Sequence, residues 1–198
     1  YEDDPCECFA PKRSNPDAYE DHSDAVIAKM HKAISIIQFK LEGQDILAHP
    51  EYEMNDRLLL DKLDLERGAL KIGGQEYPLK DTNFPTIDPT APYALSPEEA
   101  KVIEGLVSSF VNCEKLQRHI EFIYKKGSMY KYYNNCLMFH GCIPMEKDGS
   151  FTTLNVYGDV CSGKSLFDCC ERLARQGRYG EEGSEERRRG CDFMWYLW

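Results

Sequence analysis

The hydrophobic period of this chain of 198 residues changes near Gly127, and this change constrains the fold more than any other feature. Before it, apolar residues recur at three- and four-residue steps, which is typical of amphipathic helices. After it, short runs alternate between turn signals, which is typical of antiparallel strands. The sequence therefore predicts an α+β protein. A helix-rich part at residues 1–127 contains one β-hairpin, and a part rich in antiparallel hairpins follows at residues 128–198.

The first predicted helix begins at Ser23 or Asp24, either of which can cap a helix, and ends near Leu41. Gly43 supplies the stop signal, because glycine is common just past a helix end. The apolar residues of this helix recur at helical spacing: Ile27, Met30, Ile34, Ile37 and Leu41. Residues 1–22, before it, are polar and proline-containing and indicate an irregular connector.

Three further features of the helix-rich part are predicted. A short helix is expected at residues 54–63, and Gly73-Gly74 indicates a hairpin between two apolar runs. Prolines in residues 80–95 forbid a helix and favour an extended, ordered loop. Ser96 and Glu99 form a capping box around Pro97, so the next helix starts there and runs, with a break near Asn112, to Gly127.

In the second part, Asn134-Asn135 indicates a hairpin between residues 129–133 and 136–139. Another strand is expected at residues 152–157 and a helix at residues 164–175. Residues 181–190 are highly charged and are expected to be exposed.

Composition excludes several classes of protein. A net charge of −10 argues against nucleic acid or an anionic membrane as the main partner. No apolar run approaches the roughly 18 residues that a membrane helix needs. The nine cysteines are scattered, which favours reduced thiols in a cytoplasmic protein. Cys6, Cys8, Cys169 and Cys170 lack the spacing of a zinc site, so we expect small buried hydrophobic residues instead.

His140 is the candidate metal ligand. It closes a short apolar run that begins at Cys136, and Gly141 then allows a sharp turn. A neutral imidazole at a strand end is a common metal ligand. A histidine in this position is also often a hydrogen-bonded core or surface residue, so the pattern leaves both interpretations open.

Residues 158–165, Gly-Asp-Val-Cys-Ser-Gly-Lys-Ser, match the pattern of a nucleotide-binding P-loop from Gly158 to Ser165. In such a loop, backbone N–H groups cradle phosphates and the lysine, here Lys164, reaches them. However, the neighbouring strands form hairpins and not parallel βαβ units. No later apolar strand ends in the aspartate that would hold magnesium. The match is therefore interpreted as accidental.

Two other groups of charged residues allow both a functional and a structural interpretation. Arg187, Arg188 and Arg189 could clamp phosphate, but four glutamates just upstream favour a solvated face. The Asx residues of the proline-rich loop, among them Asp81 and Asp88, could be catalytic. Capping of turns is the commoner role and is the one we expect.

Seven ordered stretches of the chain resemble class III fructose-1,6-bisphosphatases, bacterial enzymes of the calcineurin-like metallophosphatase superfamily. They are residues 4–9, 28–34, 58–62, 77–89, 125–130, 140–144 and 192–198. The resemblance covers nearly the whole chain but only the middle of that family's sequence. The Asp-x-His, Asp-Arg-Gly and Asn-His motifs expected before it do not occur here, so the chain is interpreted as a truncated piece.

The resemblance implies an αββα sandwich, incomplete in this chain, to which residues 128–198 contribute. It also implies a pair of divalent ions, manganese by expectation, that serves hydrolysis of fructose 1,6-bisphosphate in gluconeogenesis. His140 would be a ligand of one ion, and no catalytic or substrate-contacting side chain is assigned. The isolated piece is expected to be inactive. A homo-oligomer and a non-catalytic helical module for subunit contacts or regulation stay open.

Overall fold

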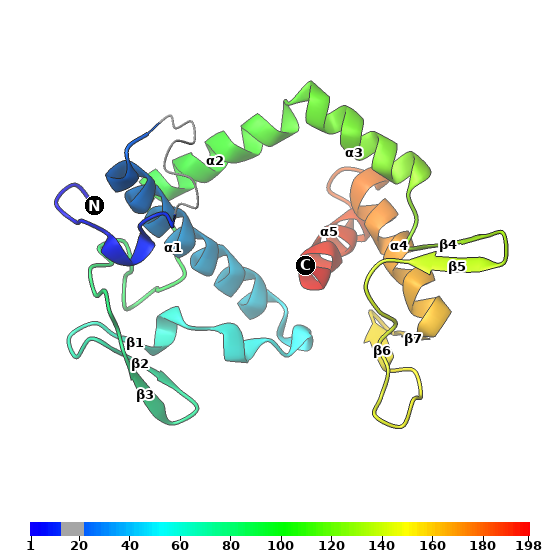
Figure 1. The fold of residues 1–198 in the computed structure, drawn as a ribbon, viewed down its shortest axis with the longest axis horizontal. Coiled ribbons are helices and arrows are strands. Elements are labelled where there is room, and N and C mark those ends of the chain that lie inside the picture. Colours follow the sequence, from blue (N-terminus) through cyan, green and yellow to red (C-terminus); the bar gives the residue numbers. More distant parts are fainter. Residues whose placement is uncertain (13–21) are drawn as a thin grey trace. The chain divides into compact units, whose positions relative to one another are not determined.

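The computed structural model describes residues 1–12 and 22–198, and these form the mixture of helices and antiparallel strands that the sequence predicts. They divide into two compact units, Tyr1–Val107 and Ser108–Trp198 (Figure 1). The predicted division after residue 127 follows secondary structure, whereas this one follows packing and lies inside helix α2 (Pro97–Val111). No sheet among the described residues has more than three strands, so the αββα sandwich stays a prediction.

Helix α1 (Asp24–Ala48) is longer than predicted, because Gly43 does not end it. Gly43 is instead the point at which α1 passes closest to Tyr93. A Cβ atom there would lie 2.0 Å from the Tyr93 ring. The phenol of Tyr93 donates a hydrogen bond of 2.7 Å to Asp61, which fixes the ring in place. Glycine at this position therefore serves close packing and not helix termination.

The buried face of α1 also differs from the predicted apolar stripe. Met30 and Ile34 are exposed, while Lys32 and Lys40 are completely buried. The buried positions are Ala28, Lys32, Ile36, Ile37, Lys40, Gly43 and Ile46. This face follows the helical period but includes two charged residues, so a pattern of apolar residues alone does not find it.

The helix predicted at residues 54–63 is wrong. Two short 3₁₀ turns, Asn55–Arg57 and Leu60–Lys62, occupy this stretch and lead into strand β1 (Leu63–Asp64). Leu58 and Leu60 are both buried. Side chains two residues apart point in different directions on an α-helix, so burying both leucines favours a non-helical backbone.

The predicted hairpin at Gly73-Gly74 and the predicted loop at residues 80–95 are confirmed. Strands β2 (Ala69–Ile72) and β3 (Gln75–Pro78) pair across Gly73 and Gly74, which both have positive φ, and β1 pairs with the other edge of β2. The proline-rich loop has no helix or strand, yet Ile87 and Tyr93 within it are buried. Residues 1–12 contain only the 3₁₀ turn Glu7–Phe9, and residues 13–21 of the predicted connector lie outside the described residues.

The capping box is present at the start of α2. The N–H of Ser96 donates to a Glu99 carboxylate oxygen at 2.8 Å, and the N–H of Glu99 donates to the Ser96 hydroxyl oxygen at 3.2 Å. Helix α3 (Glu114–Lys126) follows after the predicted break near Asn112. Within the described residues, no helix is both long and apolar enough to cross a membrane.

The second unit contains two hairpins and two helices after α3. Strands β4 (Tyr130–Tyr133) and β5 (Cys136–Phe139) join through Asn134 and Asn135, both at positive φ, as predicted. Strands β6 (Thr153–Val156) and β7 (Asp159–Ser162) form the second pair and lead into α4 (Gly163–Tyr179). The charged stretch at residues 181–190 is exposed or half-buried except at Gly190, and helix α5 (Glu185–Leu197), which was not predicted, begins within it.

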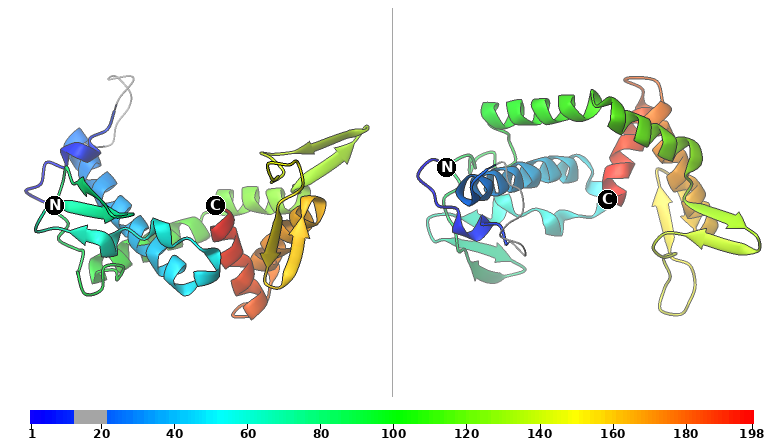
Figure 2. Two further views of the ribbon diagram at one scale, coloured as in Figure 1. Left: turned by 90° about the horizontal axis from the view of Figure 1, so that it is seen from below. Right: turned by 45° about the horizontal axis from the view of Figure 1, so that its top comes forward.

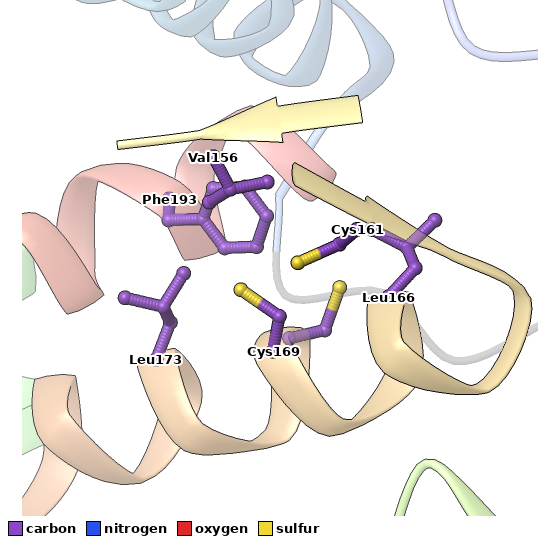
Figure 3. Packing of buried hydrophobic residues seen from close by; sticks show 7 residues of the cluster. Val156, Cys161, Leu166, Cys169, Leu173 and Phe193 are labelled. Atoms are coloured by element: carbon purple, nitrogen blue, oxygen red, sulfur yellow. The ribbon is translucent and has the colours of Figure 1, made fainter. Parts of the chain in front are cut away.

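The core of the second unit lies between the β6–β7 hairpin and the two helices α4 and α5 (Figure 3). The buried side chains are Val156, Cys161, Leu166, Cys169, Cys170, Leu173 and Phe193. The helices approach closely where Gly177 meets Gly190: a Cβ atom on Gly190 would lie 2.3 Å from the Gly177 nitrogen. Gly190, expected to be exposed, is therefore buried at the contact of the two helices.

Candidate functional site

His140 lies directly after strand β5, where the backbone bends at Gly141, whose φ is 79°. The end of β5 is held against the start of α4 by aromatic packing. The Phe167 ring lies 5.9 Å from the Phe139 ring and 6.2 Å from the Tyr130 ring, measured between centroids. These contacts place the candidate ligand at the end of the hairpin nearest to α4.

Polar contacts also attach this end of the hairpin to α4. The Tyr130 hydroxyl donates to Asp168 at 3.0 Å, and Lys164 forms an ion pair of 2.5 Å with the same carboxylate. This pairing raises the pKa of Lys164 and lowers the pKa of Asp168. Both side chains are largely exposed to solvent, so the pair orients the hairpin more than it stabilises it.

The imidazole of His140 is exposed and makes no hydrogen bond or ion pair with any of the described residues. This accessibility suits a metal ligand, because either ring nitrogen could donate its lone pair. Within the described residues, no group of three His, Cys, Asp or Glu side chains gathers that could hold an ion. His140 can therefore be one donor of a metal site, and the other donors would have to come from elsewhere.

Residues 158–165 do not form a P-loop. Gly158, with φ of 96°, lies in the turn of the β6–β7 hairpin, and the next four residues are strand β7. Their backbone pairs with β6, so it does not wrap into a phosphate cradle. The Ser165 hydroxyl accepts the Ser162 N–H at 2.9 Å and so caps α4. Lys164 is bound to Asp168, so the structure argues against the nucleotide-binding alternative.

The three consecutive arginines of α5 have local partners. Arg189 pairs with Glu185 at 2.5 Å and Arg188 with Asp192 at 3.2 Å, both one helical turn away. Arg187 donates to the carbonyl oxygen of Gly180 at 3.4 Å. These contacts support the interpretation of a solvated charged face, in preference to a phosphate clamp.

Two pockets in the second unit are also poorly suited to phosphate. One, of about 290 Å³, has apolar walls that include Met129 and Met194, and it contains Arg175. Arg175 is bound to Glu171 at 2.9 Å and to the Tyr124 carbonyl oxygen at 2.7 Å. The other, of about 200 Å³, contains Arg172 and Arg189, and both are paired with carboxylates. Neither pocket offers an arginine free of a carboxylate.

The Asx residues of the proline-rich loop cap turns, as expected. Asp88 accepts both the N–H and the hydroxyl of Thr90, at 2.8 and 2.7 Å. Asp81 accepts the Asn83 N–H at 3.0 Å but has a second role that the sequence does not indicate. It pairs with the buried Lys32 at 2.8 Å.

Lys32 is the centre of a polar cluster that sequence analysis missed. Its ammonium also pairs with Asp4 at 2.5 Å, and it lies 4.6 Å from the centroid of the Tyr1 ring. Asp4 in turn accepts the Asn83 side-chain amide at 2.8 Å. The hydrogen bond from Lys32 is the main reason why the pKa of Asp4 is low. The ammonium of Lys32 and the two carboxylates pair with one another, so the cluster joins the N-terminal segment, α1 and the proline-rich loop.

The cysteines considered as zinc ligands divide between the two units. Cys6 is buried in the first unit and Cys8 is exposed, whereas Cys169 and Cys170 belong to the core of the second unit. The three buried thiols therefore behave as small core residues, as the sequence predicts.

Comparison with known proteins gives a consistent result. The family model described as Firmicute fructose-1,6-bisphosphatase matches residues 1–198. Three relatives, each named fructose-1,6-bisphosphatase class 3, match the whole chain. The proteins of Clostridium novyi (strain NT) and Listeria innocua serovar 6a are 50% and 46% identical over 198 residues, and that of Clostridium tetani is 51% identical over 199 residues.

The matches cover the whole of this chain but only 30% of each relative. No solved structure matches the chain. With the family model extending over every residue, the chain belongs to the Firmicute fructose-1,6-bisphosphatase family.

Proposed function

We propose that this chain is a segment of a metal-dependent phosphatase that hydrolyses fructose 1,6-bisphosphate to fructose 6-phosphate and phosphate in the cytoplasm, as a step of gluconeogenesis. Membership of the family supports the activity, because the relatives are named for it. The position of His140 supports the metal dependence. An exposed imidazole at a strand end is a suitable donor for manganese or a similar divalent ion.

His140 would hold one ion of a pair, together with ligands from outside residues 1–198. The ions, when bound, would neutralise charge on the phosphate and activate water. The contribution of this chain is to orient the imidazole. The packing of Phe139 and Tyr130 on Phe167 holds the end of β5, and Gly141 allows the chain to turn away after the ligand. The hairpins of the second unit would then belong to a calcineurin-like αββα sandwich completed by the rest of the protein.

The substrate is a sugar with two phosphates and is strongly anionic, while this chain carries a net charge of −10. Arg172, Arg175 and Arg189 of the pockets in the second unit are already paired with carboxylates. The charge that attracts the substrate would therefore come mainly from the metal ions and from the rest of the protein. For this reason we expect the isolated 198-residue chain to have no appreciable phosphatase activity.

The test uses a full-length protein that contains this segment, with His140→Ala compared with Cys142→Ala, a change at an exposed neighbour two residues away. We expect His140→Ala to lower the bound manganese per chain, measured by elemental analysis after gel filtration, and to reduce hydrolysis of fructose 1,6-bisphosphate by at least about 100-fold. Cys142→Ala should change neither quantity. Full metal content and activity in His140→Ala would refute the ligand role.

The first unit favours a second, non-catalytic role for its own part of the chain. Val26, Met30 and Ile34 form an exposed apolar stripe on α1 at four-residue spacing, although apolar residues on a helix usually face a core or a partner. We propose that this stripe contacts another part of the full-length protein or another subunit.

A Met30→Glu variant of the full-length protein tests this role, with Gln38→Glu as a control at an exposed polar site of the same helix. We expect Met30→Glu to change the oligomeric state, measured by light scattering, or to lower the thermal stability of the protein. If Met30→Glu and Gln38→Glu both match the unmodified protein in these two measurements, the stripe is not a contact surface.

A further inference from the structure

Two cysteine side chains point towards each other in the core of the second unit. Cys161 belongs to strand β7, and Cys169 lies on the buried side of α4. The β6–β7 hairpin lies beside α4 in both further views of the fold (Figure 2). The two sulfur atoms face one another between hairpin and helix (Figure 3). The two thiols also share a hydrogen bond, so these side chains converge where the strand meets the helix.

Convergence of this kind is what a disulfide requires, because its sulfur–sulfur bond is only about 2.0 Å long. The neighbouring Cys170 provides a comparison. It is 4% exposed and Cys169 is 5% exposed, so the two are equally buried. Cys161, however, hydrogen-bonds to Cys169 and not to Cys170. One of the two adjacent thiols is therefore placed for a bond to Cys161, and the other is not.

The sulfur of Cys169 is also in contact with a cation. The guanidinium of Arg172 donates a hydrogen bond to this sulfur at 3.4 Å and another to the Asp159 carboxylate at 2.7 Å. Burial outweighs the cation and raises the pKa of Cys169, so Cys169 is a thiol at neutral pH. A cation at the sulfur nevertheless favours the thiolate, which is the reactive form of cysteine, when a reaction begins.

Arg172 connects this sulfur to solvent as well. Its side chain is 48% exposed and lines the pocket of about 200 Å³ that also contains Tyr157 and Gln176. A molecule as small as hydrogen peroxide fits this pocket and can reach the guanidinium that contacts Cys169. The buried pair therefore has a route by which a small oxidant can approach it.

We propose that Cys161 and Cys169 are a redox-active pair, which a hydroperoxide converts to a disulfide. One sulfur, as its thiolate, attacks a peroxide oxygen; the O–O bond breaks, and the leaving hydroxide takes up the thiol proton to become water. The second sulfur then attacks the sulfenic sulfur, an S–S bond forms, and the hydroxyl group leaves with the second thiol proton as water. The two sulfurs lose two electrons, and hydrogen peroxide is reduced to two molecules of water.

The bond would tie β7 to the part of α4 that orients the end of β5. Phe167 and Asp168 directly precede Cys169, and they contact Phe139 and Tyr130 of the β4–β5 hairpin. In reducing compartments, disulfides of this kind are usually transient and sense oxidation. The bond should therefore be reversible by a dithiol. Neither chemical step uses a metal ion, so the proposal does not depend on the role of His140.

The test uses a full-length protein that contains this segment, reduced and then treated with hydrogen peroxide. Catalase removes the excess oxidant, free thiols are alkylated in guanidinium, and tryptic peptides are analysed by mass spectrometry. Cleavage after Lys164 separates Cys161 from Cys169, and fragmentation distinguishes Cys169 from Cys170. We expect a Cys161–Cys169 link as the main disulfide, lost after treatment with dithiothreitol. If both thiols stay alkylated while the exposed Cys113 is oxidised, the proposal is wrong.

Two adjacent substitutions provide the matched control. Cys170→Ala should form the disulfide as fast as the unmodified protein, whereas Cys169→Ala should leave Cys161 unlinked. A link from Cys161 to Cys170 in either the unmodified protein or Cys169→Ala would overturn the pairing. Arg172→Met should slow disulfide formation by at least about threefold, because the thiolate loses its cation. An unchanged rate in Arg172→Met would overturn the part assigned to the guanidinium. Phosphatase activity is not measured, so failure of the proposed function would leave these results unchanged.

Discussion

In the first unit, the most deeply buried side chains include two lysines, Lys32 and Lys40, whereas the core cluster of the second unit contains thiols, aliphatic side chains and the ring of Phe193 and no charged group. The first unit joins distant segments by ion pairs: Lys32 reaches Asp4 and Asp81, and Lys40 reaches Glu99. The second unit joins its elements by close apolar packing of two helices on a hairpin. The two cores should therefore respond differently to substitution and to pH.

The largest effect is expected for Lys32→Met. This change leaves Asp4 and Asp81 partly buried without their cation, and breaking a buried ion pair in this way costs about 3–5 kcal/mol. Hydrogen exchange of α1 amides in a full-length protein would measure the loss. Lys29→Met, which removes an exposed hydrogen bond to the Glu2 carbonyl on the same helix, should cost less than about 1 kcal/mol. Equal losses of stability in the two variants would show that the buried ion pairs of Lys32 contribute no more than an exposed hydrogen bond.

Gly190→Ala should destabilise the second unit by about 1–3 kcal/mol, because an added methyl group in a tight contact forces the two helices apart. Its Cβ would lie 2.5 Å from the Leu173 carbonyl oxygen, which is backbone and does not move easily. Gly105→Ala, in the first unit, is the control, since a Cβ there meets nothing within 4 Å and the unfolding of the second unit should not change. Trp195 and Trp198 both lie in the second unit, so tryptophan fluorescence during urea unfolding reports on it.

Alkaline pH should weaken the second unit first. Burial, together with a hydrogen bond involving Cys161, raises the pKa of the Cys169 thiol to about 11 from an ordinary value of 9.0. The folded protein therefore keeps a proton that the unfolded chain loses above pH 9. The stabilisation is complete below that pH and declines as the pH rises towards 11, with a loss on the order of 1 kcal/mol. Urea unfolding at pH 8 and pH 10.5 would measure this loss, with a Cys169→Ala variant as the control. If the free energy of unfolding fell equally in both proteins, ionisation of Cys169 would not be the cause.

Acid should weaken the first unit more than the second. Burial opposes the charge of Glu99, but Lys40 and the Ser96 N–H outweigh it, so the pKa of Glu99 lies below its ordinary value of 4.5. A carboxylate with a lowered pKa stabilises the fold above its ordinary pKa, and this contribution is lost as the pH falls through the folded value. In the second unit, the carboxylates with a lowered pKa are Glu121, which is half-buried on the surface of α3, and the exposed Asp148 and Asp168, and water screens their ion pairs and hydrogen bonds. Hydrogen exchange at pH 5 and pH 3 should show faster opening of α1 than of α4; the reverse order would contradict the prediction.

The smallest effect is expected for Arg189→Ala. Arg189 forms an exposed ion pair with Glu185, and such pairs on a helix contribute less than about 1 kcal/mol. Urea unfolding followed by tryptophan fluorescence should shift only slightly, and the shift should shrink further in 1 M salt. A large loss that persists in salt would indicate that Arg189 has a role beyond the charged surface of α5.

The elements that were predicted correctly have local causes. Gly73-Gly74 and Asn134-Asn135 favour tight turns by themselves, and the Ser96–Glu99 capping box depends on residues three apart. The prediction for residues 54–63 failed because Leu58 and Leu60 are buried by contacts made elsewhere in the first unit. Helix α5 was missed because its first turns are highly charged and were expected to be exposed. The charge pattern gave no sign that Gly190 packs on α4.

In the candidate site too, the feature with a local sequence pattern was predicted and the contacts between distant residues were not. His140 was found from a strand pattern and a resemblance, and its place at the end of β5 is confirmed, whereas its metal role stays a prediction. The contacts that orient the strand end were not found. Phe167 and Asp168 are separated from Tyr130 by more than thirty residues, so no local pattern connects them.

By itself, the sequence determined the hairpins at Gly73-Gly74 and Asn134-Asn135, the capping box at Ser96 and the family, because each depends on neighbouring residues or on ordered matches along the chain. Only the tertiary structure decided which face of α1 is buried, that Gly43 and Gly190 serve close packing, and that residues 159–162 run as a strand. A buried lysine is stable only where carboxylates from distant segments meet it, and a glycine is required only where another part of the chain comes close.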